Sequence, residues 1–349
     1  KLPPHRRLSL LRDRARFRKQ ADDWPAAWTA FTELMQFLTL EERALIRDGF
    51  DAAELRHEIG AASEQLGAIH LELKQHRDAV TAYEAAAKLF ADEPNAAARL
   101  NWNLSGVYAA ANEPARAVAA LEAFLKLKPK NVASYRRYAE LLRVTDRGVE
   151  AKLEALAAES PAIPAIRWVY LAELARRDFP SAHIRFQELL ATTADDAFFD
   201  LLVKTYAEQN RPNELLAIAD ELFPAMEKNA VVTAAQSDRQ QAFASALGRE
   251  KAIAAPLLHA ARGGIHSSEL WELLAWLAER ADLSDDLEAA LRNSLRAARV
   301  DPSATAFERL ATHLSRHRKW EELLVLCDTL RDFEAYRAIL RSVSQSTRS

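Results

Sequence analysis

Apolar residues recur along most of this chain at intervals of three and four, the spacing that gathers them on one face of an α-helix. The pattern is strongest over residues 65 to 127, where two segments of similar design follow each other. Leu66 and Ala79 stand thirteen residues apart in the first segment, and Leu104 and Ala117 stand equally far apart in the second. Each segment therefore predicts two antiparallel helices joined by a turn.

Small residues mark the places where the two helices of such a hairpin cross. Gly67 and Ala79 leave room for a close approach, and larger side chains fill the space beside them. A single hairpin of this kind cannot bury its own apolar faces, so we expect neighbouring hairpins to stack.

The same positions carry a family resemblance. They are Leu66, Gly67, His70, Ala79 and Tyr83 in the first segment, and Leu104, Tyr108, Ala117, Leu121 and Pro129 in the second. This arrangement resembles the tetratricopeptide repeat (TPR), a helical hairpin of about 34 residues. The resemblance covers residues 60 to 330. It implies an all-α, right-handed superhelix (α-solenoid) of about seven to eight TPR-like hairpins with a C-terminal capping helix.

Later segments repeat the pattern less closely. They open on Tyr135, Trp168-x2-Leu171, Phe199-x2-Leu202, Trp271-x2-Leu274 and Phe307-x2-Leu310. The weakest unit spans residues 229–266, where Arg239 occupies the leucine position and Pro256 falls inside the expected second helix. Proline removes a backbone hydrogen bond there, so we expect a kink or a helix end.

The two ends of the chain depart from the repeat. Residues 1–58 predict atypical N-terminal helices that form a degenerate first repeat, beginning with a basic amphipathic helix over residues 1–20. Asp51 is expected to cap a long helix that runs to about Leu73. Residues 59–330 form the repeat array, and residues 331–349 predict a capping helix with a polar tail.

The composition of the chain favours helix and argues against several classes of function. Of the 349 residues 49% are apolar and only 8 are glycine, and the net charge of −3 gives no general attraction to nucleic acid or anionic membranes. No apolar run reaches membrane-spanning length, and no secretory signal opens the chain. The single cysteine, Cys327, fits a reducing compartment, so we predict a cytoplasmic location. Because the chain begins at Lys1, we also expect that it can be a segment of a larger protein.

The sequence contains no catalytic or cofactor-binding motif that we could identify. Phosphate-binding glycine loops, His-Glu-x-x-His and Gly-x-Ser-x-Gly are all missing. His313 and His317 stand four apart and could share a metal, but no third or fourth ligand is identifiable. Cys327 holds a position where the family places a core residue, which favours packing over reactivity. We therefore predict no enzyme activity, no cofactor, no metal site and no small-molecule substrate.

The resemblance directs attention to the first helix of each hairpin, because this helix lines the concave groove of TPR stacks. The candidate groove residues are Arg99, Trp102, Asn103, Arg136, Arg137, Arg143, Tyr170 and Arg176. Arginine pairs with carboxylates and aromatic rings supply rigid contact area, so this set predicts binding of an acidic or carboxylate-ended peptide. The alternative interpretation is a solvated charged face, with Trp102 a core residue.

One narrower function of the family is disfavoured by the residues. TPR domains that bind chaperone C-termini use a carboxylate clamp, and Asn103 and Arg137 match two of its positions. Glu64, Ala68 and Ala133 stand where the clamp needs other residues, and the negative charge of Glu64 would repel a carboxylate.

Three functions remain in order of preference. The first is a non-catalytic scaffold that binds a peptide or a partner helix in the concave groove. The second is a regulatory or docking module of a larger enzyme or receptor, which a longer natural reading frame would favour. The third is a helical-repeat nucleic-acid binder, which only the basic N-terminus supports and the net charge opposes.

Overall fold

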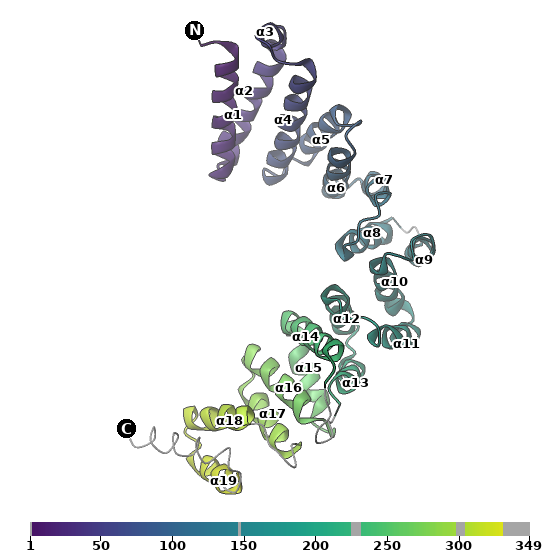
Figure 1. The fold of residues 1–349 in the computed structure, drawn as a ribbon, viewed down its shortest axis with the longest axis vertical. Helices are drawn as coiled ribbons and strands as arrows, with labels where there is room; N and C mark the ends of the chain where they lie inside the picture. Colours follow the sequence, from purple (N-terminus) through teal and green to yellow (C-terminus); the bar gives the residue numbers. More distant parts are fainter. Residues whose placement is uncertain (1, 146–147, 225–231, 298–303, 331–349) are drawn as a thin grey trace. The chain divides into compact units, whose positions relative to one another are not determined.

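The computed structural model describes residues 2–145, 148–224, 232–297 and 304–330 (Figure 1). Within these residues the chain forms nineteen α-helices and one short 3₁₀ helix, and it forms no strand. The all-α prediction is therefore confirmed. The chain divides into two compact units, residues 1–169 and 170–349.

The first unit contains nine complete helices and the start of a tenth. They are α1 (Pro4–Gln20), α2 (Trp24–Leu40), α3 (Glu42–Arg47), α4 (Ala52–Glu72), α5 (His76–Leu89), α6 (Pro94–Ala110), α7 (Pro114–Leu125), α8 (Val132–Val144), α9 (Val149–Glu159) and α10 (Pro164–Arg177). α1 packs on α2, α2 packs on α4, and each helix from α4 to α8 packs on the helix that follows it (Figure 1). The helices therefore rely on their sequence neighbours, as in a solenoid.

The second unit continues the same plan from the end of α10. Its further helices are α11 (Phe179–Leu190), α12 (Asp196–Glu208), α13 (Pro212–Leu222), α14 (Ala234–Arg249), η1 (Lys251–Ile253), α15 (Ala254–Ala261), α16 (Ser268–Arg280), α17 (Ser284–Ala297), α18 (Ala304–Arg316) and α19 (Trp320–Leu330). α12 packs on α13 and α14, and α15 to α18 each pack on the next helix. Taken in consecutive pairs, the α-helices from α4 to α19 give eight helix–turn–helix units.

Two parts of the fold prediction remain predictions. The expected capping helix over residues 331–349 lies outside the described residues. The right-handed sense of the superhelix also stays a prediction, because each unit is defined by itself.

Six hairpin turns share one backbone geometry. In each, a residue other than glycine adopts a left-handed conformation with φ between 51° and 62°: Asp22, Lys74, Asn112, Asn210, Asp282 and Arg318. The amide of the next residue then donates to a carbonyl five residues back, as Glu113 N does to Tyr108 O at 2.7 Å. This is the Schellman helix ending, which satisfies carbonyls that the helix leaves unpaired. The hairpins therefore repeat in their turns even where the sequence pattern weakens.

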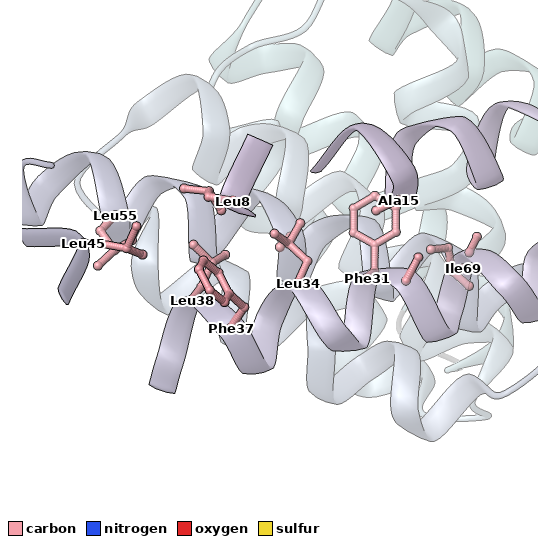
Figure 2. Close-up of a cluster of buried hydrophobic side chains, with 12 residues drawn as sticks. Leu8, Ala15, Phe31, Leu34, Phe37, Leu38, Leu45, Leu55 and Ile69 are labelled. Carbon is pink, nitrogen blue, oxygen red and sulfur yellow. The ribbon is translucent and has the colours of Figure 1, made fainter. Parts of the chain in front are cut away.

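The N-terminal region is a packed helical cluster with one helix that the sequence did not predict. Leu8 and Ala15 of α1 and Phe31, Leu34 and Leu38 of α2 are buried together with Leu45 of α3 and with Leu55 and Ile69 of α4 (Figure 2). The short α3 buries Leu45 and occupies part of the chain between α2 and α4. Asp51 stands directly before α4 as expected, but its side chain makes no capping hydrogen bond.

The predicted close crossing inside a hairpin is confirmed at Gly67. A Cβ on this residue of α4 would lie 2.6 Å from the ring of Tyr83 in α5, which is nearer than real Cβ atoms approach. Tyr83 is 4% exposed and Ala79 is fully buried. Gly67 is therefore the residue that lets α4 and α5 approach each other.

Pro256 lies at the start of the second helix of its hairpin and not in the interior of that helix, where the sequence predicted a kink or a helix end. The second helix of that hairpin begins as the 3₁₀ turn η1, and α15 starts at Ala254, so Pro256 lies in the first turn of α15. Amides in the first turn of a helix have no intrahelical partner, so proline is tolerated there.

Candidate peptide-binding surface

Ion pairs connect the first helices of consecutive hairpins. Examples are Arg99–Glu64 at 2.7 Å, Arg176–Glu208 at 2.6 Å, Arg249–Asp200 at 2.6 Å and Arg309–Glu279 at 2.9 Å. Three of these arginines lie 30 to 35 residues from their partners, and Arg249 lies 49 residues from Asp200. Two of the eight predicted site residues, Arg99 and Arg176, thus contribute to contacts within the chain.

In the Arg99–Glu64 pair, hydrogen-bond donors of the arginine are engaged by a carboxylate of the chain itself. Arg99 donates from Nε and Nη2 to the two carboxylate oxygens of Glu64, at 2.7 and 2.8 Å. This hydrogen bonding raises the pKa of Arg99 above its usual value. The arrangement is bidentate, the strongest geometry that arginine and carboxylate form. Glu64 is therefore neutralised by its neighbour, which weakens the repulsion expected from its charge.

Arg137 of α8 has a different environment. Its guanidinium lies over the ring of Trp102 in α6, 4.4 Å from the ring centroid, and Trp102 in turn contacts Phe124 of α7. A Cβ on Gly106 of α6 would overlap the guanidinium. The lack of a side chain at Gly106 therefore leaves room for the guanidinium of Arg137. Burial lowers the pKa of Arg137, against the smaller opposing influence of Glu140.

Among the described residues no carboxylate or other acceptor bonds to the guanidinium of Arg137, and Glu140 acts on its charge without bonding to it. A half-buried cation without a counterion is an unusual feature, since burial of a charge is normally offset by pairing. We call Trp102, Gly106 and Arg137 the Arg137 site. An anion that reached it would meet a planar donor held flat by an aromatic ring.

The remaining predicted residues are only partly gathered around this site. Asn103 is half-buried on α6 beside Trp102 in sequence, and Arg136 is half-buried on α8 beside Arg137. Arg143, at the end of α8, is exposed. Tyr170 and Arg176 belong to the second unit, where Tyr170 is half-buried and Arg176 is held by Glu173 and Glu208. Trp102, which the alternative interpretation assigns to the core, is only partly buried, and its ring contacts Phe124 and Arg137.

Sequence reasoning missed a groove in the second unit. A cavity of about 700 Å³ lies along α14 and α16, with Gly248, Trp276 and Arg280 in its lining. The contact between Gly248 and Trp276 could not be predicted from the sequence, because the two residues lie in different repeats. Gly248 also matches no position of the repeat pattern.

The histidine pair is held by structural contacts. The rings of His313 and His317 lie 4.4 Å apart, and His313 Nε2 is 3.7 Å from Glu288, which already accepts from Lys319 and Arg292. Burial lowers the pKa of His313. In the described ranges no three histidine, cysteine, aspartate or glutamate side chains gather as metal ligands would. The side chain of Cys327 lies outside the described part of the chain.

Every described helix is either too short or too polar to cross a bilayer.

Comparisons with known proteins identify no family for this chain. Neither a scan against protein-family models nor a search of curated proteins finds a match to this sequence. Among solved structures, the chain is similar to one in the structure of Naa15/Naa10 bound to HypK-THB, with 15% identity and a TM-score of 0.43 over 93% of this chain and 50% of that chain. It is also similar to yeast Tom70, with 16% identity and a TM-score of 0.37 over 88% of this chain and 63% of that chain. The chain thus spans half the length of the first and less than two thirds of the second.

Proposed function

We propose that this chain is a non-catalytic protein-interaction scaffold that binds an acidic peptide segment of a partner protein at the Arg137 site. The observation that carries the proposal is the guanidinium of Arg137, which lies half-buried over Trp102 without a counterion among the described residues. Stacked helical hairpins present long continuous surfaces of this kind to peptides and helices.

The contrast with the paired arginines supports this choice of residue. Arg99 and Arg176 are each engaged by a carboxylate of the chain itself, so a ligand would have to displace Glu64 or Glu208 to reach them. Arg137 offers its donors without such competition. A carboxylate there would gain charge-assisted hydrogen bonds and would offset the unfavourable burial of the cation.

The neighbourhood of Arg137 favours a peptide carboxylate. Trp102 supplies a rigid aromatic surface that Phe124 holds in place, and Asn103 can donate to or accept from a peptide backbone. A nucleic acid would require many phosphate contacts spread along the surface, and the chain carries a net charge of −3. We therefore place the acidic peptide first.

The test is binding of fluorescently labelled peptides to the whole chain, followed by anisotropy. The probes are a glutamate-rich peptide with a free C-terminus, its amidated form and a lysine-rich peptide of equal length. We expect the glutamate-rich peptides to bind best and Arg137→Glu to weaken them by roughly tenfold or more. Arg77→Glu makes the same charge change on the exposed start of α5 and is the matched control.

A second variant separates charge from geometry. Arg137→Lys keeps the positive charge and loses the planar stack on Trp102, so we expect an intermediate affinity. Equal binding of all three peptides, or equal losses for Arg137→Glu and Arg77→Glu, would remove the proposal. Circular dichroism of each variant establishes that the helices remain folded.

A further inference from the structure

The second unit contains a groove that the Arg137 site does not involve. Its volume is about 700 Å³, and its lining comes chiefly from α14 and α16. The residues of α16 that line it are Glu269, Glu272, Leu273, Trp276 and Arg280, which stand on one face of that helix at helical spacing. One continuous helical face thus forms one wall of the groove.

α14 and α16 run in the same direction on either side of this groove. Gln240 in the first half of α14 and Ser267 directly before α16 both bind the end of α13: Gln240 donates to Leu222 O at 2.8 Å, and Ser267 donates to Phe223 O at 2.6 Å. Towards their C-terminal ends they meet again, where Gly248 lies against the ring of Trp276. A Cβ on Gly248 would overlap that ring, so glycine leaves room for the tip of the indole.

The centre of the groove is apolar and its two ends differ in charge. Trp276 is half-buried, and Ala244 and Leu273 lie beside it in the lining. Glu269 lies in the first turn of α16 and Arg280 in its last turn, about 16 Å apart along the helix at 1.5 Å per residue. The groove therefore runs from an acidic end, through an aromatic centre, to a basic end.

Not all of these charges are occupied by the chain. Arg249 is paired with Asp200 and Arg309 with Glu279. Glu272 and Arg280 take part in no ion pair within the described ranges, although the guanidinium of Arg280 lies 5.1 Å from the Trp276 ring centroid. Unpaired charges of both signs thus remain on the groove wall, since Glu269 also takes part in no ion pair within the described ranges.

We propose that this groove binds an amphipathic α-helix of a partner protein, lying antiparallel to α14 and α16. Helices commonly carry acidic residues in their first turn and basic residues in their last, because these complement the helix dipole. Only the antiparallel orientation brings such a first turn to Arg280 and such a last turn to Glu269 and Glu272. The same orientation opposes the dipole of the bound helix to those of α14 and α16, and the apolar side of the helix then contacts Trp276.

The site and its ligand are distinct from the acidic peptide proposed above, since all residues of the groove belong to the second unit. Partner binding by an aromatic anchor with charged residues at both ends is typical of interface centres that dominate affinity. Trp276 is expected to be that anchor, and the charges are expected to fix the direction of the bound helix.

The experiment is a selection on the whole chain from a displayed library of helical peptides. Each peptide has a fixed apolar stripe at its centre and randomised charged residues in its first and last turns. We expect selected peptides to carry acidic residues in the first turn and basic residues in the last. Synthetic copies of the most enriched peptides should bind Trp276→Ala more weakly by roughly tenfold or more.

Two further variants make the result decisive. The double exchange Glu272→Arg with Arg280→Glu should invert the charge preference of the selection, and both positions are at the surface of α16, so folding is expected to be retained. Trp320→Ala removes a tryptophan that is 45% exposed on α19 and should leave binding unchanged. A selection without charge preference, or peptides that bind wild type and Trp276→Ala equally, would overturn the inference.

Discussion

Gly67 of α4 and Gly106 of α6 hold the same kind of close approach on consecutive first helices. At Gly67 the side chain that occupies the space is the ring of Tyr83, from the second helix of the same hairpin. At Gly106 it is the guanidinium of Arg137, from the first helix of the next hairpin. The missing Cβ therefore fixes the core in one place and shapes a charged surface in the other.

The two side chains differ in the free energy that each gains or loses by being buried. Tyr83 is neutral and gains from burial, and burial together with the charge of Glu64 raises its pKa to about 12. Arg137 is charged, and burial lowers its pKa because the charged form is disfavoured. Local features that oppose stability concentrate at functional sites. A glycine at a close helix approach thus indicates core packing at Gly67 and a ligand-binding surface at Gly106.

The largest expected effect is on stability at the first of these glycines. Gly67→Ala forces a methyl group against the fixed Tyr83 ring, and overpacking of this kind costs about 1–3 kcal/mol. The better helix propensity of alanine returns up to about 1 kcal/mol, so a net loss remains. Hydrogen exchange of the α4 and α5 amides in increasing urea measures it locally. Unchanged protection of these two helices would contradict the packing role of Gly67.

The same substitution at the second glycine should separate stability from binding. Gly106→Ala meets the end of a flexible side chain, so Arg137 can swing away and the free energy of unfolding should change by less than about 1 kcal/mol. We expect affinity for the glutamate-rich peptide to fall several-fold, because the guanidinium leaves its place over Trp102. Anisotropy and urea unfolding of the same preparation measure both quantities. A drop in stability as large as that of Gly67→Ala would refute the comparison.

Much of this fold could be predicted from the sequence, because its determinants are local. Helix positions follow from the spacing of apolar residues, and Gly67 with Ala79 marked the hairpin crossing that the structure contains. The residues with a left-handed conformation in the turns were harder to predict from the sequence. Lys74 and Arg318 adopt that conformation although neither residue favours it, since the helix ending and the hairpin geometry dictate it.

The candidate site was harder to predict because its chemistry depends on residues one repeat away. Arg99 and Arg137 look alike in the sequence, yet Arg99 lies opposite Glu64 and Arg137 lies opposite Gly106 and Trp102. The helical pattern assigns both to the same face and says nothing of which cation is already paired. The groove at Trp276 was missed for the same reason, since Gly248 makes room for it from another hairpin.

A smaller effect is expected when the paired arginine is released. Glu64→Gln removes the bidentate partner of Arg99 with little change in shape, so Arg99 becomes available to an acidic peptide near Arg137. We expect the affinity for the glutamate-rich peptide to rise by roughly two- to fivefold, and stability to fall by less than about 1 kcal/mol. Glu279→Gln, which frees Arg309 in the second unit, is the matched control. Weaker binding by Glu64→Gln would show that Arg99 must stay paired for the site to form.

The smallest expected effect is a pH dependence confined to alkaline solution. Tyr83 and Tyr108 both have a pKa raised from 10.0 to about 12, in each case chiefly by burial. Tyr108 also donates to Glu84 at 2.6 Å, a hydrogen bond that only the neutral phenol can make. Because the folded state favours the neutral form, the stabilising contribution is complete below pH 10 and is lost as the pH rises towards about 12.

Thermal unfolding across this range, with tyrosinate absorbance as a second signal, measures the dependence. Tyr108→Phe should flatten the alkaline fall in stability of the first unit, because it removes a phenol that the folded state keeps neutral. An equal fall in wild type and Tyr108→Phe would mean that the Tyr108–Glu84 contact contributes nothing to the join between α5 and α6.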